Sequence, residues 1–211
     1  MTESIFDTPR SHMPAFLPAL PFSGVFLFPG TRLDLRVYER RYIHLIFNAL
    51  ADTRIIGVVH PSEQPLPLKS PKLYSVGCAG RITGFTESDN LLLVTLTGLS
   101  RFRIVRETEY PGTAYKSVEA DYTPFETDFS TARHSYDKRR LYHALDRYAA
   151  AMNLDFSSAA LKNTPPERVL STLASVLPFT CAEKQALIEC ETREKFYDTL
   201  VLLLEMNAAS L

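Results

Sequence analysis

One segment decides the fold of this chain: residues 17–42, which read LPALPFSGVFLFPGTRLDLRVYERRY. Pro18 and Pro21 keep its first part extended, because proline fixes its own backbone and restrains the residue before it. The apolar run VFLF then ends at Pro29-Gly30, a dipeptide typical of turns. In residues 33–37 apolar and charged side chains alternate, which is the period of a half-buried strand. The segment therefore predicts extended chain, a turn and a strand that leads into a helix.

The residues that follow this segment predict a β-rich first half with one helix. Apolar side chains recur at helical spacing over residues 40–51, so we expect an amphipathic helix there. Gly77, Gly80 and Gly84 lie among apolar residues, which indicates a long, bent strand with bulges, as barrels need. Strands are predicted at residues 54–60, 73–85, 91–97, 101–106 and 113–122, with Gly98 as an interruption. These strands and the single helix favour a small closed or nearly closed barrel.

The second half of the chain changes to helical periodicity. Leu141, Leu145 and Tyr148 share one helical face. Two Thr-x-x-Glu capping boxes follow, at residues 164–167 and 180–183, and the first has proline at the first helical position. The first box is predicted to open a helix that ends before Pro178, and the second a short helix to about residue 189. A last helix is predicted over about residues 192–206.

The order of these features resembles the N-terminal substrate-binding domain of Lon proteases. The resemblance is closest to stand-alone bacterial proteins that carry this domain alone, in which the pattern reads roughly LPLFPL…VLFPG…LPL.IFEPRY. The matching positions are Pro18, Leu20-Pro21, Phe28-Pro29-Gly30, Leu33, Leu35 and Glu39-x-Arg41-Tyr42. The matches further along are Gly98 with Arg101-Phe102-Arg103, then Lys184-Gln185, Leu187 and Glu189. Arg40 departs from the family, which usually has proline there.

We therefore predict an α+β fold: a β-barrel-like, PUA-like N-terminal part with one helix, followed by a C-terminal helical bundle. The expected organisation is a flexible N-terminal tail over residues 1–15, a β-rich Lon-type barrel over residues 16–126 and a helical subdomain over residues 127–211. The PUA-like comparison is an analogy at the level of the fold alone. The resemblance also implies a stand-alone domain without the ATPase and Ser–Lys peptidase regions of full-length Lon.

Catalytic and metal-binding motifs are absent from the sequence. It contains no GxxxxGK[ST], HExxH, GxSxG or GxGxxG pattern, so neither ATP hydrolysis nor a familiar hydrolase mechanism is indicated. Cys78, Cys181 and Cys190 form no CxxC pair, and we interpret them as reduced thiols. We predict no catalytic residue, no metal site and no cofactor.

Two groups in the opening segment are candidates for substrate binding. If some of its phenylalanines are exposed rather than in the core, they would form an apolar patch able to hold unfolded chain. Glu39 either stabilises the start of the helix through its dipole and capping, or lines a groove with its neighbours Arg41 and Tyr42. An exposed sheet edge could add main-chain hydrogen bonds to an extended peptide. The candidate substrate-binding residues are Phe22, Phe26, Phe28, Glu39, Arg41 and Tyr42.

The function we expect is non-catalytic binding of unfolded or extended polypeptide segments, with a separate protease or chaperone as a further partner. The first alternative is a small-molecule-binding protein or hydrolase with a pocket around Glu39, His60 or His134. The second is an RNA-binding module of PUA-like type, which needs arginines to converge on one face; the candidates are Arg32, Arg36, Arg101 and Arg103.

The formal net charge of −1 favours neither nucleic acid nor a membrane as partner. The N-terminal residues do not form a signal peptide, and the longest apolar run is far too short to span a bilayer. We therefore expect a cytoplasmic protein.

Overall fold

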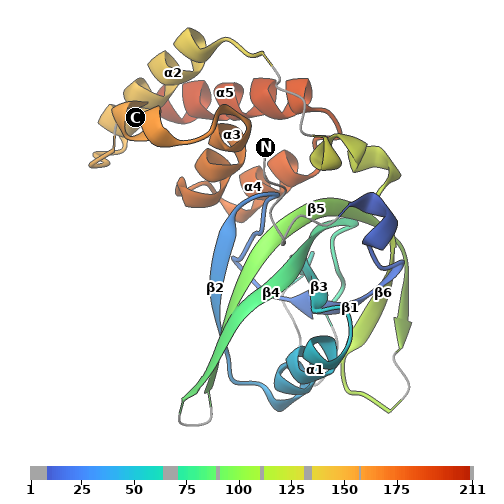
Figure 1. Ribbon diagram of the computed structural model, residues 1–211. Helices are drawn as coiled ribbons and strands as arrows, with labels where there is room; N and C mark the ends of the chain where they lie inside the picture. The colour runs from blue at the N-terminus through green and yellow to red at the C-terminus, as the bar shows by residue number, and fades with distance from the viewer. Residues whose placement is uncertain are drawn as a thin grey trace. The chain divides into compact units, whose positions relative to one another are not determined.

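The computed structural model describes residues 9–63, 71–88, 91–109, 112–130, 135–156 and 158–209. The chain divides into two compact units, Met1–Ser130 and Thr131–Leu211. The first is built mainly from strands and the second from helices, so the predicted α+β class is confirmed (Figure 1). Several predicted features lie outside the described residues: the first half of the tail, most of the proline-rich segment after Pro61 and the tip of the hairpin at residues 89–90.

The first unit contains six strands, one α-helix and two 3₁₀ turns within its described residues. These elements are η1 (Arg10–His12), β1 (Phe16–Pro21), β2 (Arg32–Val37), α1 (Arg40–Ala51), β3 (Ile55–Val59), β4 (Val76–Ser88), β5 (Leu91–Glu109), β6 (Lys116–Asp121) and η2 (Thr123–Phe129). The predicted helix has the observed bounds of α1. Tyr42, Leu45 and Ile46 lie on its buried face, as the amphipathic pattern requires.

The strands close into a barrel. Their order is β2-β5-β4-β3-β1-β6, and β5 also pairs with β6. The strands β5, β4, β3, β1 and β6 therefore form a ring, while β2 lies outside it and pairs with the first part of β5 (Figure 1). Only β1 and β3 run parallel; the other pairs are antiparallel. The barrel predicted from the strand pattern is confirmed.

The long strand β5 corrects one prediction. Gly98 does not separate two strands, because β5 continues through it from Leu91 to Glu109. This length lets β5 pair with β2 and β4 in its first part and with β4 and β6 in its second. The bulges expected from the glycines of β4 are present, since the β4–β5 register shifts at Ala79/Gly80 and at Ile82/Gly84. Such bulges bend strands and so help a sheet to close.

Buried side chains from most strands meet in the core of the barrel. Phe102 of β5 is fully buried and packs with Leu17, Ile55, Ala79 and Val118. A Cβ on Gly57 would lie 2.9 Å from the Phe102 ring, and one on Gly77 would lie 2.6 Å from a main-chain oxygen of β3. These two glycines therefore make room for the large aromatic ring and for the neighbouring strand.

The described part of the predicted tail, residues 9–15, contacts the barrel. Arg10 forms an ion pair with Glu126 of η2. The N–H of Ala120 donates to the carbonyl oxygen of Ala15 at 2.8 Å, and the Tyr122 hydroxyl donates to that of Pro14 at 2.9 Å. These bonds extend the sheet contacts of β1 toward the N-terminus. Residues 9–15 thus lie against the barrel, and the flexibility expected for the tail stays a prediction.

The second unit consists of helices within its described residues. They are α2 (Lys138–Ala151), η3 (Ser158–Asn163), α3 (Pro166–Val176), α4 (Cys181–Ile188) and α5 (Arg193–Ala209). The predicted capping box at α4 is confirmed: the Thr180 hydroxyl accepts the N–H of Glu183, and the Glu183 carboxylate accepts the N–H of Thr180. The first predicted box is wrong, because Pro165 rather than Thr164 occupies the N-cap of α3. Proline at the first helical position is nevertheless observed, as Pro166.

Candidate functional site

The apolar loop between β1 and β2 is buried. The exposed fractions of Phe26, Leu27 and Phe28 are 8%, 1% and 0%. The carbonyl oxygen of Phe28 passes so close to Gly98 that a Cβ there would lie 2.1 Å from it. Phe26 and Phe28 therefore cannot form the exposed apolar patch considered from the sequence, because their rings are needed to fill the core. Phe22 is half-buried.

His60, at the end of β3, holds this loop in place. Its ring stacks on Phe26 with the centroids 4.8 Å apart. The N–H of Gly24 donates to Nε2 of His60 at 2.9 Å, and Nδ1 lies 2.8 Å from the carbonyl oxygen of Pro61. Because Nε2 accepts, Nδ1 carries the proton and the ring is neutral. Burial lowers the pKa of His60, which favours the same neutral form. With both nitrogens engaged, His60 has a structural role.

The strand-to-helix corner after β2 brings three predicted residues together. Arg41 donates from Nε to the Glu39 carboxylate at 2.9 Å, and its guanidinium lies 4.6 Å above the Tyr42 ring. Glu39 is the N-cap residue of α1, but its side chain makes no capping hydrogen bond. The capping role suggested for this carboxylate is thus replaced by an ion pair. Burial raises the pKa of Tyr42, whose exposed fraction is 5%.

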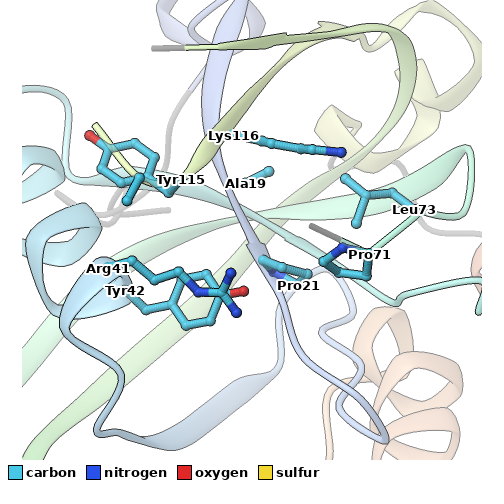
Figure 2. A pocket seen from close by; sticks show the side chains of 9 residues that line it. Ala19, Pro21, Arg41, Tyr42, Pro71, Leu73, Tyr115 and Lys116 are labelled. Carbon is cyan, nitrogen blue, oxygen red and sulfur yellow. The ribbon is translucent and has the colours of Figure 1, made fainter. Parts of the chain in front are cut away.

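A small hollow lies beside this corner (Figure 2). Figure 2 shows Arg41 and Tyr42 on one side of it and Tyr115 with Lys116 on the other, with Ala19 and Pro21 of β1 between. The enclosed space is about 10 Å³, roughly that of one water molecule. Pockets that bind small molecules are far larger, at about 300 Å³ or more. The two cations are also neutralised, Arg41 by Glu39 and Lys116 by Glu107. This hollow gives the small-molecule alternative no support.

The free edge of β2 is the most distinctive feature of the described surface. β2 pairs with β5 alone among the described strands, and Figure 1 shows it at the outer side of the sheet. The N–H of Gly98 donates to the Thr31 carbonyl, and the register continues without a shift from Arg32 opposite Thr97 to Val37 opposite Leu92. Alternate residues of an antiparallel strand turn their backbone groups to the partner. Arg32, Asp34 and Arg36 therefore turn theirs outward; we call this row the β2 edge.

Side chains next to the β2 edge are both charged and apolar. Asp34 accepts a hydrogen bond from Thr95 at 2.6 Å, which lowers the pKa of its carboxyl, and it also accepts from Arg32. Leu93 lies opposite Arg36 and is 39% exposed, while Tyr38, just beyond the strand, is 69% exposed. Tyr38 thus adds an exposed aromatic ring next to the C-terminal end of the edge, while Leu93 lies on β5, on the paired side of β2. The sequence alone did not predict which strand has an exposed edge. The alternating charges of RLDLRV could have indicated β2, since edge strands often carry charge.

The arginines considered for RNA binding do not form one exposed face. Arg101 has an exposed side-chain fraction of 3% and is paired with Asp128, which is 6% exposed. Asp128 accepts from the main-chain N–H, Nε and a terminal nitrogen of Arg101 at 2.8–2.9 Å. The guanidinium also lies 4.7 Å above the Phe125 ring. Arg101 therefore ties β5 to η2 and is not available to a phosphate.

The comparisons with known proteins decide the family. The model of the ATP-dependent protease La (LON) substrate-binding domain matches residues 16–204. The chain belongs to this family. It is 35% identical to a Lon protease of Anaeromyxobacter dehalogenans over 117 residues, which cover 52% of this chain and 14% of that protein. The chain therefore spans only a small part of the length of the curated relatives that it matches.

Two solved structures share the fold. The Lon N-terminal domain protein from Xanthomonas campestris has a TM-score of 0.60 and 22% identity, covering 88% of this chain and 96% of the other. The N-terminal domain of a Mycobacterium avium complex Lon protease has a TM-score of 0.62 and 18% identity, covering 93% and 100%. The match is to the substrate-binding domain of Lon and not to its catalytic domains.

Two kinds of feature, metal-binding clusters and membrane-spanning helices, are missing from the described residues. No group of three or more His, Cys, Asp or Glu side chains is placed to hold a metal ion there. No helix in that part of the chain has the length and apolar character needed to cross a membrane.

Proposed function

We propose that this Lon-type domain binds extended or unfolded polypeptide segments and catalyses no reaction on them. The observation that carries the proposal is the free β2 edge, which presents outward-facing backbone groups of Arg32, Asp34 and Arg36. The family description, a substrate-binding domain, supports the same function. A separate protease or chaperone would then receive the bound segment.

The mechanism is the addition of a strand to the sheet. An extended segment forms main-chain hydrogen bonds with an exposed edge whatever its side chains are, so one edge can accept many sequences. Tyr38, just beyond the strand, offers apolar contact to a side chain of the segment. The charges of the β2 edge disfavour indiscriminate aggregation with other exposed strand edges.

The corner after β2 extends this site. Glu39 follows Tyr38 directly, and Arg41 lies two residues further along. Both are partly exposed, and they form an ion pair with each other. In this proposal they bind the polar end of a captured segment. Tyr42 holds Arg41 in position through a cation–π contact, with the guanidinium 4.6 Å from the ring centroid. Phe22 stays a candidate as a half-buried residue, whereas Phe26 and Phe28 have packing roles.

Fluorescence anisotropy with a labelled, permanently unfolded polypeptide tests the proposal. Arg36→Pro removes an outward N–H at a position where an edge strand tolerates proline. We expect it to weaken binding about tenfold, because a ladder hydrogen bond is lost at the centre of the site. The matched control Arg36→Gln removes the charge and keeps the N–H, and it should bind nearly as well as the unmodified chain.

Two results would contradict the proposal. One is the absence of any saturable binding to unfolded polypeptide. The other is equal binding by Arg36→Pro and Arg36→Gln while both remain folded by circular dichroism. A labelled single-stranded RNA, titrated in parallel, would reveal binding that collapses with salt if the RNA alternative held.

A further inference from the structure

The side chains of the β2 edge have unused capacity for ion pairing. Arg36 is exposed and makes no hydrogen bond or ion pair with any residue that the structure describes. Asp34 uses Oδ1 for Thr95 and Arg32, which leaves Oδ2 without a partner within the described residues. An arginine and a half-used carboxylate therefore stand two residues apart on one exposed strand.

The direction of the backbone groups limits how a further strand can pair here. Arg32, Asp34 and Arg36 turn their N–H and C=O groups outward. In an antiparallel ladder, residues that exchange two hydrogen bonds stand directly opposite one another. If the added strand is β2 of a second copy, outward-facing residues must therefore stand opposite outward-facing residues.

In one such register, oppositely charged side chains face one another. It places Asp34 opposite Arg36 of the second copy, and two-fold symmetry repeats this pair the other way round. Leu35 then lies opposite Leu35 of the second copy on the axis, and Leu33 lies opposite Val37; the side chains of Leu35 and Val37 stay buried in their own copies. Arg32 stands opposite the exposed ring of Tyr38, a geometry that allows a cation–π contact. Opposite charges and apolar pairs directly across a ladder are the stabilising combinations.

The neighbouring allowed registers are unfavourable. A shift by two in one direction places Asp34 opposite Asp34 and Arg32 opposite Arg36, so that all the facing charges are alike. The shift in the other direction places Arg36 opposite Arg36. Like charges directly opposite destabilise a strand pair. The sequence RLDLRV thus favours the register centred on Leu35 over the two registers next to it.

We infer that the β2 edge pairs with β2 of a second copy of this chain, antiparallel and centred on Leu35, to form a two-fold dimer with a continuous sheet. The inference goes beyond the proposed function and does not depend on it. Where both hold, the second copy and a polypeptide segment compete for the same edge, and self-pairing covers the site while no segment is present.

The expected dimer is weak, because two short strands bury much less surface than a stable interface needs. Its charge pairs are exposed, so raising the salt from about 0.05 M to about 0.5 M should weaken it. Sedimentation equilibrium between about 10 μM and 1 mM, the range in which such weak affinities are measured, is the suitable experiment.

Charge reversal provides the decisive test. Asp34→Arg leaves the strand with three arginines, and Arg36→Asp leaves it with two adjacent outward carboxylates. Each variant alone should self-associate about tenfold more weakly, because both central pairs become repulsive. An equimolar mixture of the two should dimerise again, since residue 34 of each chain then faces the opposite charge at residue 36 of the other chain. The double variant D34R/R36D should also regain self-association.

The controls separate self-pairing from other effects. Thr95→Val removes the hydrogen bond to Asp34 but no charge, and it should leave the dimer in place. A chain that stays monomeric at every concentration overturns the inference, as does a dimer that neither single reversal weakens. Failure of the mixture to associate also overturns it. None of these results bears on polypeptide capture, which is measured on dilute, monomeric protein.

Discussion

Two adjacent parts of the opening segment differ in burial. The loop around Phe26–Phe28 is apolar and fully withdrawn into the core, whereas β2, a few residues later, is charged and keeps one side open. The apolar part was the obvious candidate for holding unfolded chain, but its side chains are buried. The open part offers main-chain groups instead. In this opening segment, the accessible feature is therefore a row of backbone groups and not a cluster of exposed aromatic rings.

The largest effect is expected from Phe28→Ala. This ring is fully buried, so its removal should lower the free energy of unfolding by about 4 kcal/mol through lost burial and a residual cavity. Urea denaturation measures the loss. Phe22→Ala is the control, and it should cost much less because Phe22 is only half-buried. Equal losses at both positions would remove the distinction between core loop and surface.

The next largest loss of stability is expected from Gly98→Ala, which disrupts the contact between β5 and the loop around Phe28. The new Cβ would lie 2.1 Å from the Phe28 carbonyl oxygen, so the backbone must move, and we expect a loss of about 3 kcal/mol. Gly84→Ala on β4 is the matched control, because its Cβ would meet Thr95 at an ordinary 3.6 Å. Thermal unfolding compares the two. If Gly98→Ala were as stable as Gly84→Ala, the close approach of the loop would be wrong.

A pH-dependent effect is expected at His60. Its pKa is lowered in the folded chain, so below about pH 6.5 the unfolded chain binds a proton that the folded chain does not. The stability that His60 contributes is therefore complete above this range and is lost as the pH falls toward the folded-state pKa. Urea denaturation from pH 7.5 down to about pH 5 should show a slope that His60→Gln reduces. His44→Gln, which removes an exposed histidine of α1, is the matched control.

The smallest effect is expected on β2 itself. Arg36→Gln changes an exposed side chain without a partner among the described residues, so stability should change by about 0.5 kcal/mol or less. The same denaturation experiment measures it. A large loss would mean that β2 contributes to the fold through its outward side chains and is not an open edge.

The sequence determined the local structure well wherever one short pattern was sufficient. The α1 bounds followed from apolar spacing, β2 from alternation, and the start of α4 from the Thr180–Glu183 capping box, because each depends on residues a few positions apart. The pattern of family motifs likewise identified the domain type. The box at Thr164 failed, since the adjacent prolines moved the helix start by one residue to Pro165.

Only the tertiary structure decided which of these elements meet. Closure of the ring depends on β5 pairing with β6 as well as with β4, and Gly98 is tolerated within β5 because the Phe28 carbonyl occupies the space of a side chain. The burial of Phe28 and Arg101 and the openness of β2 follow from that closure. Periodicity reports which face of a strand is apolar, but not whether its edge has a neighbour. Short-range patterns therefore specified the individual elements and the family, whereas long-range strand pairing decided which edge of the sheet is left open.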